Sequence, residues 1–345
     1  MKKITAALLC VMLVISTSVT AFGATKNDVK EKIDTAVAFA FDGNYSKNGY
    51  DVSASKNLYI LAQSGADISA FATDYFKSVS DAAAAGTLTD TGVIGMAVTI
   101  ADLAGADPEN INGTDLTNML KNADPVAVST PYNYFYAIEA AVNHGMKDTA
   151  AAFSNALAKY YVPGTGTDFW NGYGTSPDDL AMFILSMETA GAYTEYTKDA
   201  FEILETFATP DGYSNYGANA DSTALALAAC AAAGNTEKAD EIYDILIKNY
   251  YDPETGGFLA DYDEYYATAD AVFALRFYLP LADDAAPQES TTGNHETTTE
   301  SSSAQQNKDT GTKSPNTGFS VFPAAGAALF ALAAGGLLVK RNKNK

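Results

Sequence analysis

The chain has 345 residues, of which 42 are acidic and 21 are basic, so its formal net charge at pH 7 is −21. Such a charge repels phosphate backbones and argues against nucleic acid as a partner. A well solvated surface accounts for most of the excess of acidic residues.

The first 24 residues have the layout of a secretory signal peptide. Two lysines precede the apolar run 6–15, and the segment ends in the small residues Ala21, Gly23 and Ala24. We expect this segment to be removed on export. Cys230 is then the only cysteine left, so no intrachain disulfide can form.

Residues 25–283 contain one structural unit that is repeated along the sequence. Five glycines each close an apolar or alanine-rich stretch, and they are spaced by 40 to 46 residues. Glycine just past a helix end adopts the left-handed cap conformation without a Cβ penalty, and regular spacing of this kind marks a helical repeat. The glycines are Gly65, Gly105, Gly145, Gly191 and Gly234.

The stretches before these glycines predict inner helices. Several of them are apolar nearly all round and too short to cross a membrane, which is typical of helices in a protein core. Thr130 and Ser176 each precede a proline, and we expect Asp90, Asp221 and Thr268 to cap other helices. The expected inner helices lie near residues 54–64, 91–104, 131–144, 177–190, 221–233 and 268–281.

Outer helices are expected between the inner ones, with apolar residues on one stripe only. Val29, Ile33 and Val37 are spaced by four residues, as are Ile242 and Leu246. Six outer–inner pairs predict one all-α domain over residues 25–283, because a single pair cannot bury its apolar face alone.

The links into several inner helices are rich in glycine and aromatic residues, as in GTGTDFWNGYG (164–174), PDGYSNYG (210–217) and PETGGFLADYDEYY (253–266). With the helices that follow, they resemble the repeats of terpenoid cyclases and protein prenyltransferases, and of bacterial surface domains similar to cobalamin-binding intrinsic factor. The resemblance covers residues 25–283 and is best defined from about residue 150 onward. It implies an (α/α)6 toroid, which is a closed ring of six helix pairs, with a partly open ring as the alternative.

The catalytic residues of these enzyme families are only partly represented. Protein prenyltransferases bind zinc through Asp, Cys and His, whereas this domain offers only Cys230 and His144, in different repeats, so we expect no metal and no cofactor. Squalene-type cyclases protonate their substrate with a DxDD motif, whose nearest match, 261–264, ends in Glu. A solvated acidic loop or a cation site is the alternative interpretation of that match. Asp178 and Asp179 form a second acidic pair, in the first turn of a predicted helix. Their alternative role there is to complement the helix dipole. The candidate catalytic residues are Asp261, Asp263, Asp178 and Asp179.

In a ring of this type every link precedes an inner helix, so all links open onto one mouth. Aromatic side chains at a concave rim bind sugars, peptides or apolar ligands. The alternative is that several of them plug the end of the ring. The candidate ligand-binding residues are Trp170, Tyr173, Tyr213, Tyr216, Phe258, Tyr262 and Tyr265, and the same set of links holds Tyr45, Tyr50 and Phe169.

Two classes of function fit these residues. The first is a binding or adhesion module for a small molecule, a glycan or a protein, which is favoured because no complete catalytic set is found. The second is an extracellular enzyme, either terpene cyclase-like or glycoside-active, that uses carboxylates at the mouth. An apolar ring interior would favour binding, whereas facing carboxylates in a deep cleft would favour hydrolysis.

The C-terminal part predicts attachment to a cell wall. Residues 284–313 are rich in Ser and Thr and contain no aromatic residue, which indicates a disordered stalk. The uncharged run 319–339 is long enough for a transmembrane helix and is followed by a basic tail that stays in the cytoplasm. A plain membrane anchor is the alternative, but it leaves unexplained the motif Ser314, Pro315, Asn316, Thr317 and Gly318.

This pentapeptide resembles the LPxTG-type sorting signal, with Ser314 in place of Leu. The resemblance implies that a sortase cuts residues 314–345 between Thr317 and Gly318 and joins Thr317 to peptidoglycan. The expected product is a secreted protein on the wall of a Gram-positive cell, whose precursor is held transiently in the plasma membrane.

Overall fold

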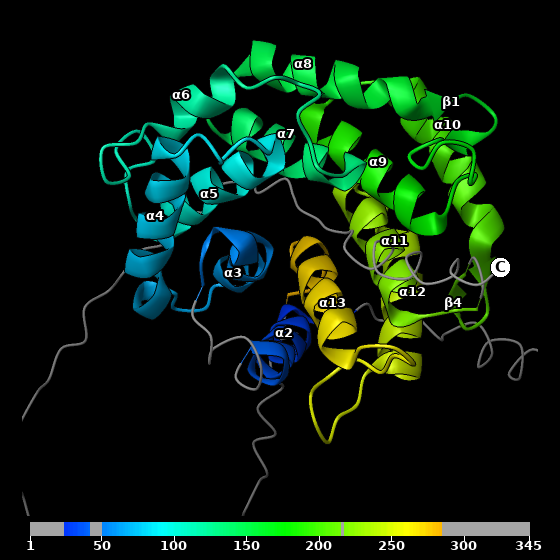
Figure 1. Cartoon of the computed structure of the whole chain (residues 1–345). Coiled ribbons are helices and arrows are strands. Elements are labelled where there is room, and N and C mark those ends of the chain that lie inside the picture. The colour runs from blue at the N-terminus through cyan, green and yellow to red at the C-terminus, as the bar shows by residue number, and fades with distance from the viewer. Residues whose placement is uncertain (1–23, 42–49, 215–216, 285–345) are drawn as a thin grey trace, which may run out of the picture.

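The helices end at the glycines that the sequence spacing predicted. The computed structural model describes residues 24–41, 50–214 and 217–284, which form an all-α protein with two short hairpins (Figure 1). Gly65, Gly105, Gly145, Gly191 and Gly234 all have positive φ, between 61° and 84°. Because these angles are in the left-handed region, the predicted caps are confirmed.

The inner helices are found close to their predicted positions. Their burial follows from composition: in α11, for example, every residue from Ala220 to Ala231 is buried. The six inner helices of the described residues are α3 (Ser55–Gln63), α5 (Thr91–Leu103), α7 (Tyr134–Asn143), α9 (Pro177–Ala190), α11 (Ala220–Ala232) and α13 (Glu264–Tyr278).

Two of the predicted caps are wrong. The cap of α11 is Asn219, and Asp221 is the second residue inside the helix. Helix α13 begins four residues before the predicted cap Thr268, because Asp263 accepts hydrogen bonds from the first-turn amides. The Thr268 hydroxyl instead accepts a hydrogen bond from the Phe258 amide, at 2.8 Å.

The outer helices bury one face, as the apolar stripes predicted. In α2, Val29, Ile33, Ala36 and Ala40 are buried, whereas the remaining face is largely polar. The outer helices of the described residues are α2 (Lys26–Ala40), α4 (Ser69–Ala84), α6 (Leu116–Lys121), α8 (Lys147–Leu157), α10 (Thr194–Leu204) and α12 (Thr236–Tyr250).

Each inner helix contacts the next inner helix along the chain, and the last contacts the first. The contacts run from α3 through α5, α7, α9 and α11 to α13, and α13 also contacts α3. Helices α4, α6, α8 and α10 lie on the outside of this series (Figure 1). Helices α5 and α7 approach closely at Gly95, where a Cβ atom would lie 2.4 Å from the Tyr136 carbonyl oxygen.

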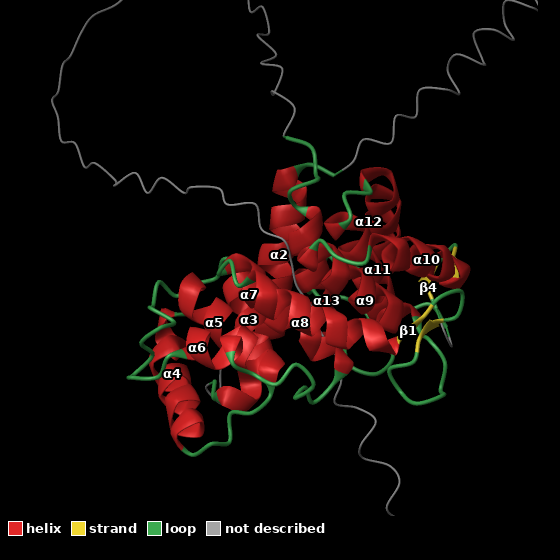
Figure 2. Cartoon of the chain, turned by 90° about the horizontal axis from the view of Figure 1, so that it is seen from above, coloured by secondary structure: helices red, strands yellow, loops and turns green. Residues whose placement is uncertain are grey.

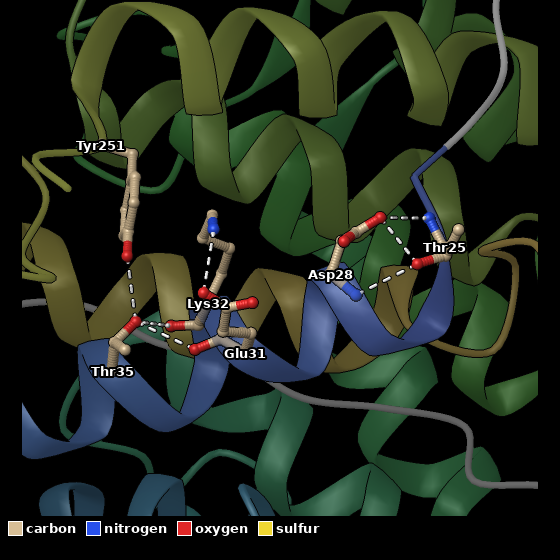
Figure 3. A network of polar contacts seen from close by, with 6 residues as sticks. All are labelled: Thr25, Asp28, Glu31, Lys32, Thr35 and Tyr251. Atoms are coloured by element: carbon tan, nitrogen blue, oxygen red, sulfur yellow. Dashed lines mark hydrogen bonds and ion pairs between the residues drawn. The ribbon is translucent and has the colours of Figure 1, made fainter. Parts of the chain in front are cut away.

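Helix α2 packs against the last helix pair (Figure 3). Its start is fixed by a capping box between Thr25 and Asp28. One turn before its end, the Thr35 hydroxyl is hydrogen-bonded to the Tyr251 hydroxyl at 3.0 Å. The Lys32 ammonium lies 4.9 Å from the centre of the Tyr251 ring.

The same hydrogen-bonding arrangement occurs in the links before α9, α11 and α13. Strand β1 (Tyr161–Val162) pairs with β2 (Gly166–Thr167), and β3 (Ala208–Thr209) pairs with β4 (Gly212–Tyr213), beside α10 (Figure 2). In the last link a single bridge joins Tyr251 to Phe258. The amides of Thr167, Tyr213 and Phe258 each donate to a threonine hydroxyl near the start of the following helix. This bond holds each link over the N-terminal end of its inner helix.

The two ends of the described domain lie side by side. The Lys26 amide donates to the Asp283 carbonyl at 2.8 Å, and the Asp283 amide donates to the Ala24 carbonyl at 3.0 Å. The Lys26 ammonium also forms an ion pair with Asp284 at 2.7 Å. Both ends therefore lie at the C-terminal end of α13, which we call the base.

Within residues 24–41, 50–214 and 217–284, no helix is both long enough and apolar enough to cross a membrane. The predicted signal peptide (but for Ala24), the sorting motif 314–318 and the span 319–339 lie outside the described residues, as do Tyr45, Tyr216 and all of the stalk except Asp284.

Candidate functional site

A pocket of about 780 Å³ lies at the N-terminal ends of α9, α11 and α13, which is the end of the domain opposite the base. Its volume is in the range of small-molecule sites, about 300–1,000 Å³. The three links supply most of its wall, and the end of α12 supplies the rest. The polar and aromatic side chains of the wall are those of Ser176, Asp178, Asn219, Ser222, Asn249, Tyr250, Asp261, Tyr262 and Glu264.

Asp178 is the second residue of α9 and faces this pocket. Its side chain is hydrogen-bonded to Ser222, while its Oδ1 atom is buried and has no hydrogen-bond partner among the described residues. Burial raises its pKa to about 6, and the charge of Asp179 contributes to the same shift. Asp178 therefore changes protonation close to neutral pH.

Asp221 occupies the corresponding second position of α11. It is only 7% exposed, and its Oδ1 atom also has no hydrogen-bond partner among the described residues. Burial raises its pKa to about 7, the charge of Asp178 adds to the rise, and Lys56 opposes it. The electrostatic effect of Asp178 on Asp221 indicates that the two carboxyl groups are close.

Asp270 lies deeper, in the second turn of α13. It is fully buried, and neither of its carboxyl oxygens has a hydrogen-bond partner in the described part of the chain. Burial raises its pKa strongly, Lys56 opposes the rise, and Asp221 and Asp178 add to it. The charge of Asp178 therefore acts on both buried aspartates, and of the three only Asp178 lines the pocket.

Lys56, in the first turn of α3, is the cation that acts on Asp221 and Asp270. Burial lowers its pKa to about 8, although the charges of Asp270 and Asp221 act in the opposite direction. Its ammonium lies 4.7 Å from the centre of the Tyr266 ring, a distance at which a cation–π contact is favourable. We name the group Asp178, Asp221, Asp270, Lys56 and Tyr266 the interior cluster.

Asp179 has a different role from its neighbour Asp178. Its carboxylate accepts hydrogen bonds from the Tyr132 hydroxyl at 2.6 Å, from Trp170 Nε1 at 3.0 Å and from the Ser176 amide at 3.1 Å. It also completes the capping box at the start of α9. Burial raises its pKa, and these hydrogen bonds oppose the rise. All of its contacts are structural, which supports a role at the helix start over a catalytic one.

The acidic run 261–264 does not form one cluster. Asp261 is exposed and lines the pocket, whereas Asp263 caps α13 and accepts hydrogen bonds from the Tyr265 and Tyr266 amides. Glu264 also lines the pocket. A motif that shares one proton among its carboxyl groups needs them together, so this geometry favours the interpretation as an acidic loop.

The aromatic candidates divide into exposed and packed side chains. Trp170 is 37% exposed, Tyr262 is 57% exposed and Tyr173 is 91% exposed. Tyr265 instead stacks on Phe39, with ring centres 5.0 Å apart. Of these four, only Tyr262 lines the pocket.

Four further aromatic residues from the links, Tyr50, Phe169, Tyr213 and Phe258, are buried, so the expectation of an open aromatic rim needs correction for them. Tyr213 is 1% exposed and donates a hydrogen bond to Glu205, at 2.7 Å, and Phe258 is fully buried. Phe169 is also buried. These rings support the links from inside, and none of them can stack on a ligand in this conformation.

A second buried polar group joins α3, α7 and α13. Glu139 accepts a short hydrogen bond from the Tyr59 hydroxyl and a longer one, at 3.3 Å, from Gln63. The Arg276 guanidinium lies 3.8 Å from the same carboxylate. Burial raises the pKa of Glu139 to about 7, while Arg276 opposes the rise. This group was not predicted from the sequence.

In the described ranges, no group of three or more His, Cys, Asp or Glu side chains is arranged to hold a metal ion. Cys230 is buried, and its burial raises the pKa of the thiol to about 12. The His144 ring instead pairs with Asp102 at 2.9 Å.

Sequence reasoning missed the deeper members of the site. Asp270 is the only charged residue between Ala267 and Leu275, and Asp221 is the only one in α11. A lone charge in an otherwise apolar helix is costly to bury without a partner. That signal was present in the sequence and pointed to these two positions.

Comparison with known proteins gives no family assignment. No protein-family model matches the chain, and no curated protein matches it.

Proposed function

We propose that residues 25–283 form an (α/α)6 toroid of the kind found in terpenoid cyclases and protein prenyltransferases. The order of helix contacts supports the proposal, because α3 to α13 contact one another in sequence and α13 returns to α3. The alternation of amphipathic outer helices with apolar inner helices supports it as well.

The chain's two terminal segments support a place outside the cell. We propose that a sortase joins Thr317 to peptidoglycan and that residues 284–313 form a stalk that carries the domain. In the described residues the pocket and the base are at opposite ends of α13, a helix of 15 residues. At 1.5 Å per residue this separation is about 20 Å. A stalk that leaves from the base therefore directs the pocket away from the wall.

The function that the site supports best is that of a surface-displayed binding or adhesion module for a small molecule, a glycan or a protein. The observation that carries this proposal is the pocket of about 780 Å³, with exposed Tyr262 and with Asp178 and Asn219 in its wall. Tyrosine provides a flat face, and the carboxylate and amide groups provide acceptors and donors for a ligand's polar groups.

A binding screen of residues 25–283 against glycans and metabolites tests the proposal. We expect Tyr262→Ala to weaken binding of any ligand found by at least tenfold, which is about 1.4 kcal/mol. Tyr173→Ala is the matched control, since Tyr173 is 91% exposed and does not line the pocket. Equal binding by the Tyr262→Ala protein and the unmodified domain would show that the ligand does not use this pocket.

An extracellular hydrolase is the second candidate, and one observation favours it. Asp178 and Asp221 stand at corresponding positions of neighbouring helices, and both have pKa values raised towards neutrality. Glycoside hydrolysis needs one protonated and one ionised carboxyl group, and a raised pKa is also what a cyclase-like acid requires. Release of reducing ends from a glycan substrate, abolished both by Asp178→Asn and by Asp221→Asn, would identify this activity.

A further inference from the structure

The pocket wall carries negative charge without a compensating cation. Asp178, Asp261 and Glu264 all line it, and no lysine or arginine is found among the described residues of the wall. Tyr250 and Tyr262 are the aromatic side chains of the same wall. A wall of carboxylates and tyrosine rings is the combination that binds organic cations in proteins.

The interior cluster behind the pocket has an excess of acceptors. One oxygen of Asp178, one of Asp221 and both of Asp270 are buried without a hydrogen-bond partner in the described residues. Buried polar atoms are nearly always hydrogen-bonded in folded proteins, so such a group of exceptions indicates a functional site. Lys56 is the only described cation that lowers the pKa of Asp221 or Asp270, so one positive charge faces several carboxyl groups.

We propose that this pocket recognises a positively charged amine, a primary ammonium group carried by a small ligand such as an amino sugar or an alkyl diamine. The inference rests on the proposed binding function and specifies its ligand class. An ammonium group has three donors and no acceptor, which complements the carboxyl groups of Asp178, Asp261 and Glu264 in the pocket wall. The contact of Lys56 with Tyr266, at 4.7 Å, shows the same chemistry one layer deeper in the protein.

Binding of such a cation is coupled to protonation. Burial raises the pKa of Asp178 to about 6 and that of Asp221 to about 7, so both are largely protonated at pH 5. A bound ammonium group favours their charged forms, so the affinity rises as the pH rises from about 5 to about 7. The titratable and charged groups that face this region come from every element packed around it: Asp178 and Asp179 on α9, Asp221 on α11, Tyr250 at the end of α12, Asp261 and Tyr262 in the last link, Asp263, Glu264, Tyr266 and Asp270 at or in α13, Lys56 on α3, and Tyr132 and Tyr136 at and in α7.

Calorimetric titration of residues 25–283 tests the inference with two matched pairs of probes. Cadaverine is compared with 1,5-pentanediol, and the disaccharide of glucosamine is compared with cellobiose, so that the members of each pair differ only by two amine groups in place of two hydroxyl groups. We expect at least one amine to bind at least tenfold more tightly than its neutral match at about pH 7, and severalfold more weakly at about pH 5. The pair that responds identifies whether the source is an alkyl amine or an amino sugar.

Variants then assign the binding to this pocket. Asp178→Asn keeps the size of the side chain, and we expect it to reduce amine affinity at least tenfold. Asp81→Asn is the control, because Asp81 lies on the exposed face of α4 in an ion pair with Lys77 and its loss removes the same charge from the molecule. Thermal melting followed by circular dichroism shows that both variants are folded before they are titrated.

The outcomes separate this inference from the proposed function. Equal affinity for an amine and its neutral match, or equal loss of amine binding in both variants, overturns the inference. If cellobiose binds as well as the amino sugar and Tyr262→Ala removes both, the proposed binding function stands and only the ligand class is wrong. Absence of amine binding overturns the inference, whatever the glycan and metabolite screen finds.

Discussion

Two neighbouring aspartates are expected to respond in opposite ways to the same substitution. Asp179→Asn should destabilise the domain, because this carboxylate is 1% exposed and accepts hydrogen bonds from Tyr132, Trp170 and Ser176. Asp178→Asn should stabilise it near pH 8, because the charged form of Asp178 is disfavoured by burial.

The magnitudes follow from the contacts. In the Asp179→Asn protein the amide oxygen can face Tyr132 and Trp170. The NH2 group then faces the Ser176 amide, which is itself a donor, so that hydrogen bond is lost. The bonds from Tyr132 and Trp170 remain but become weaker, because their acceptor is no longer charged. Bonds to a charged acceptor contribute about 1.5–3 kcal/mol and neutral ones about 1 kcal/mol. Relief of the buried charge offsets part of the loss, so we expect a net loss of about 2 kcal/mol, which is about 4–8 °C for a domain of this size.

For Asp178 the expected change in stability on substitution has the opposite sign. Its pKa rises from 3.8 to about 6 on folding, so the folded state binds more protons in this interval and stability falls as the pH rises through it. One pKa unit corresponds to about 1.4 kcal/mol. Because Asp178 is partly accessible to solvent, we discount this figure and expect Asp178→Asn to add about 1 kcal/mol at pH 8. At pH 4 the wild-type side chain is itself neutral, so the gain disappears.

Urea unfolding of both variants at about pH 4 and about pH 8, followed by circular dichroism, measures these differences. Asp81→Asn on the exposed face of α4 corrects for the change in net charge. The reasoning is refuted if the two variants lose similar stability at pH 8, or if the effect of Asp178→Asn does not depend on pH.

The remaining predictions concern packing, pH, metals and anchoring. Gly95→Ala should cost about 1–3 kcal/mol in urea unfolding, since its Cβ would lie 2.4 Å from a backbone oxygen of α7. The Glu139→Gln domain should lose less stability than wild type between pH 5 and pH 8, because the Glu139 pKa is raised from 4.5 to about 7 and stability falls as the pH rises through this interval. EDTA and reductant should leave the circular dichroism unchanged; a large loss of helix with EDTA would indicate a structural cation at Asp261 and Asp263. Mass spectrometry of wall fragments should find Thr317 as the C-terminal residue, and intact chains that retain residues 319–345 as the main species would disprove sorting.

Helix positions were largely predictable because local signals define them. The glycine caps and the proline after Ser176 act through local backbone conformation alone. The structure has helix ends at these positions. Asp221 and Thr268 misled the prediction because a capping side chain and a side chain just inside the helix look the same in sequence. The Thr268 hydroxyl instead accepts a hydrogen bond from the Phe258 amide. This contact depends on how the link folds back over the helix.

The candidate site was less predictable because its members come from different repeats. Asp178 and Asp179 are adjacent, and only the tertiary positions of Tyr132 and Trp170 decide that Asp179 is structural. Asp270 and Lys56 lie far apart in sequence and become electrostatic partners only when α3 and α13 come into contact. Aromatic residues predicted as one rim divide for the same reason, since Tyr265 stacks on Phe39, which lies in α2.

The adjacent ends of the domain determine how it would carry mechanical load. Residues 24–26 and 283 are joined by two backbone hydrogen bonds at the base, and α13 runs from there to the pocket. Tension between a held ligand and the stalk would act along the axis of α13. Its contacts with α2 and α11 would then be loaded in shear, so that many weak contacts share the force instead of breaking one after another.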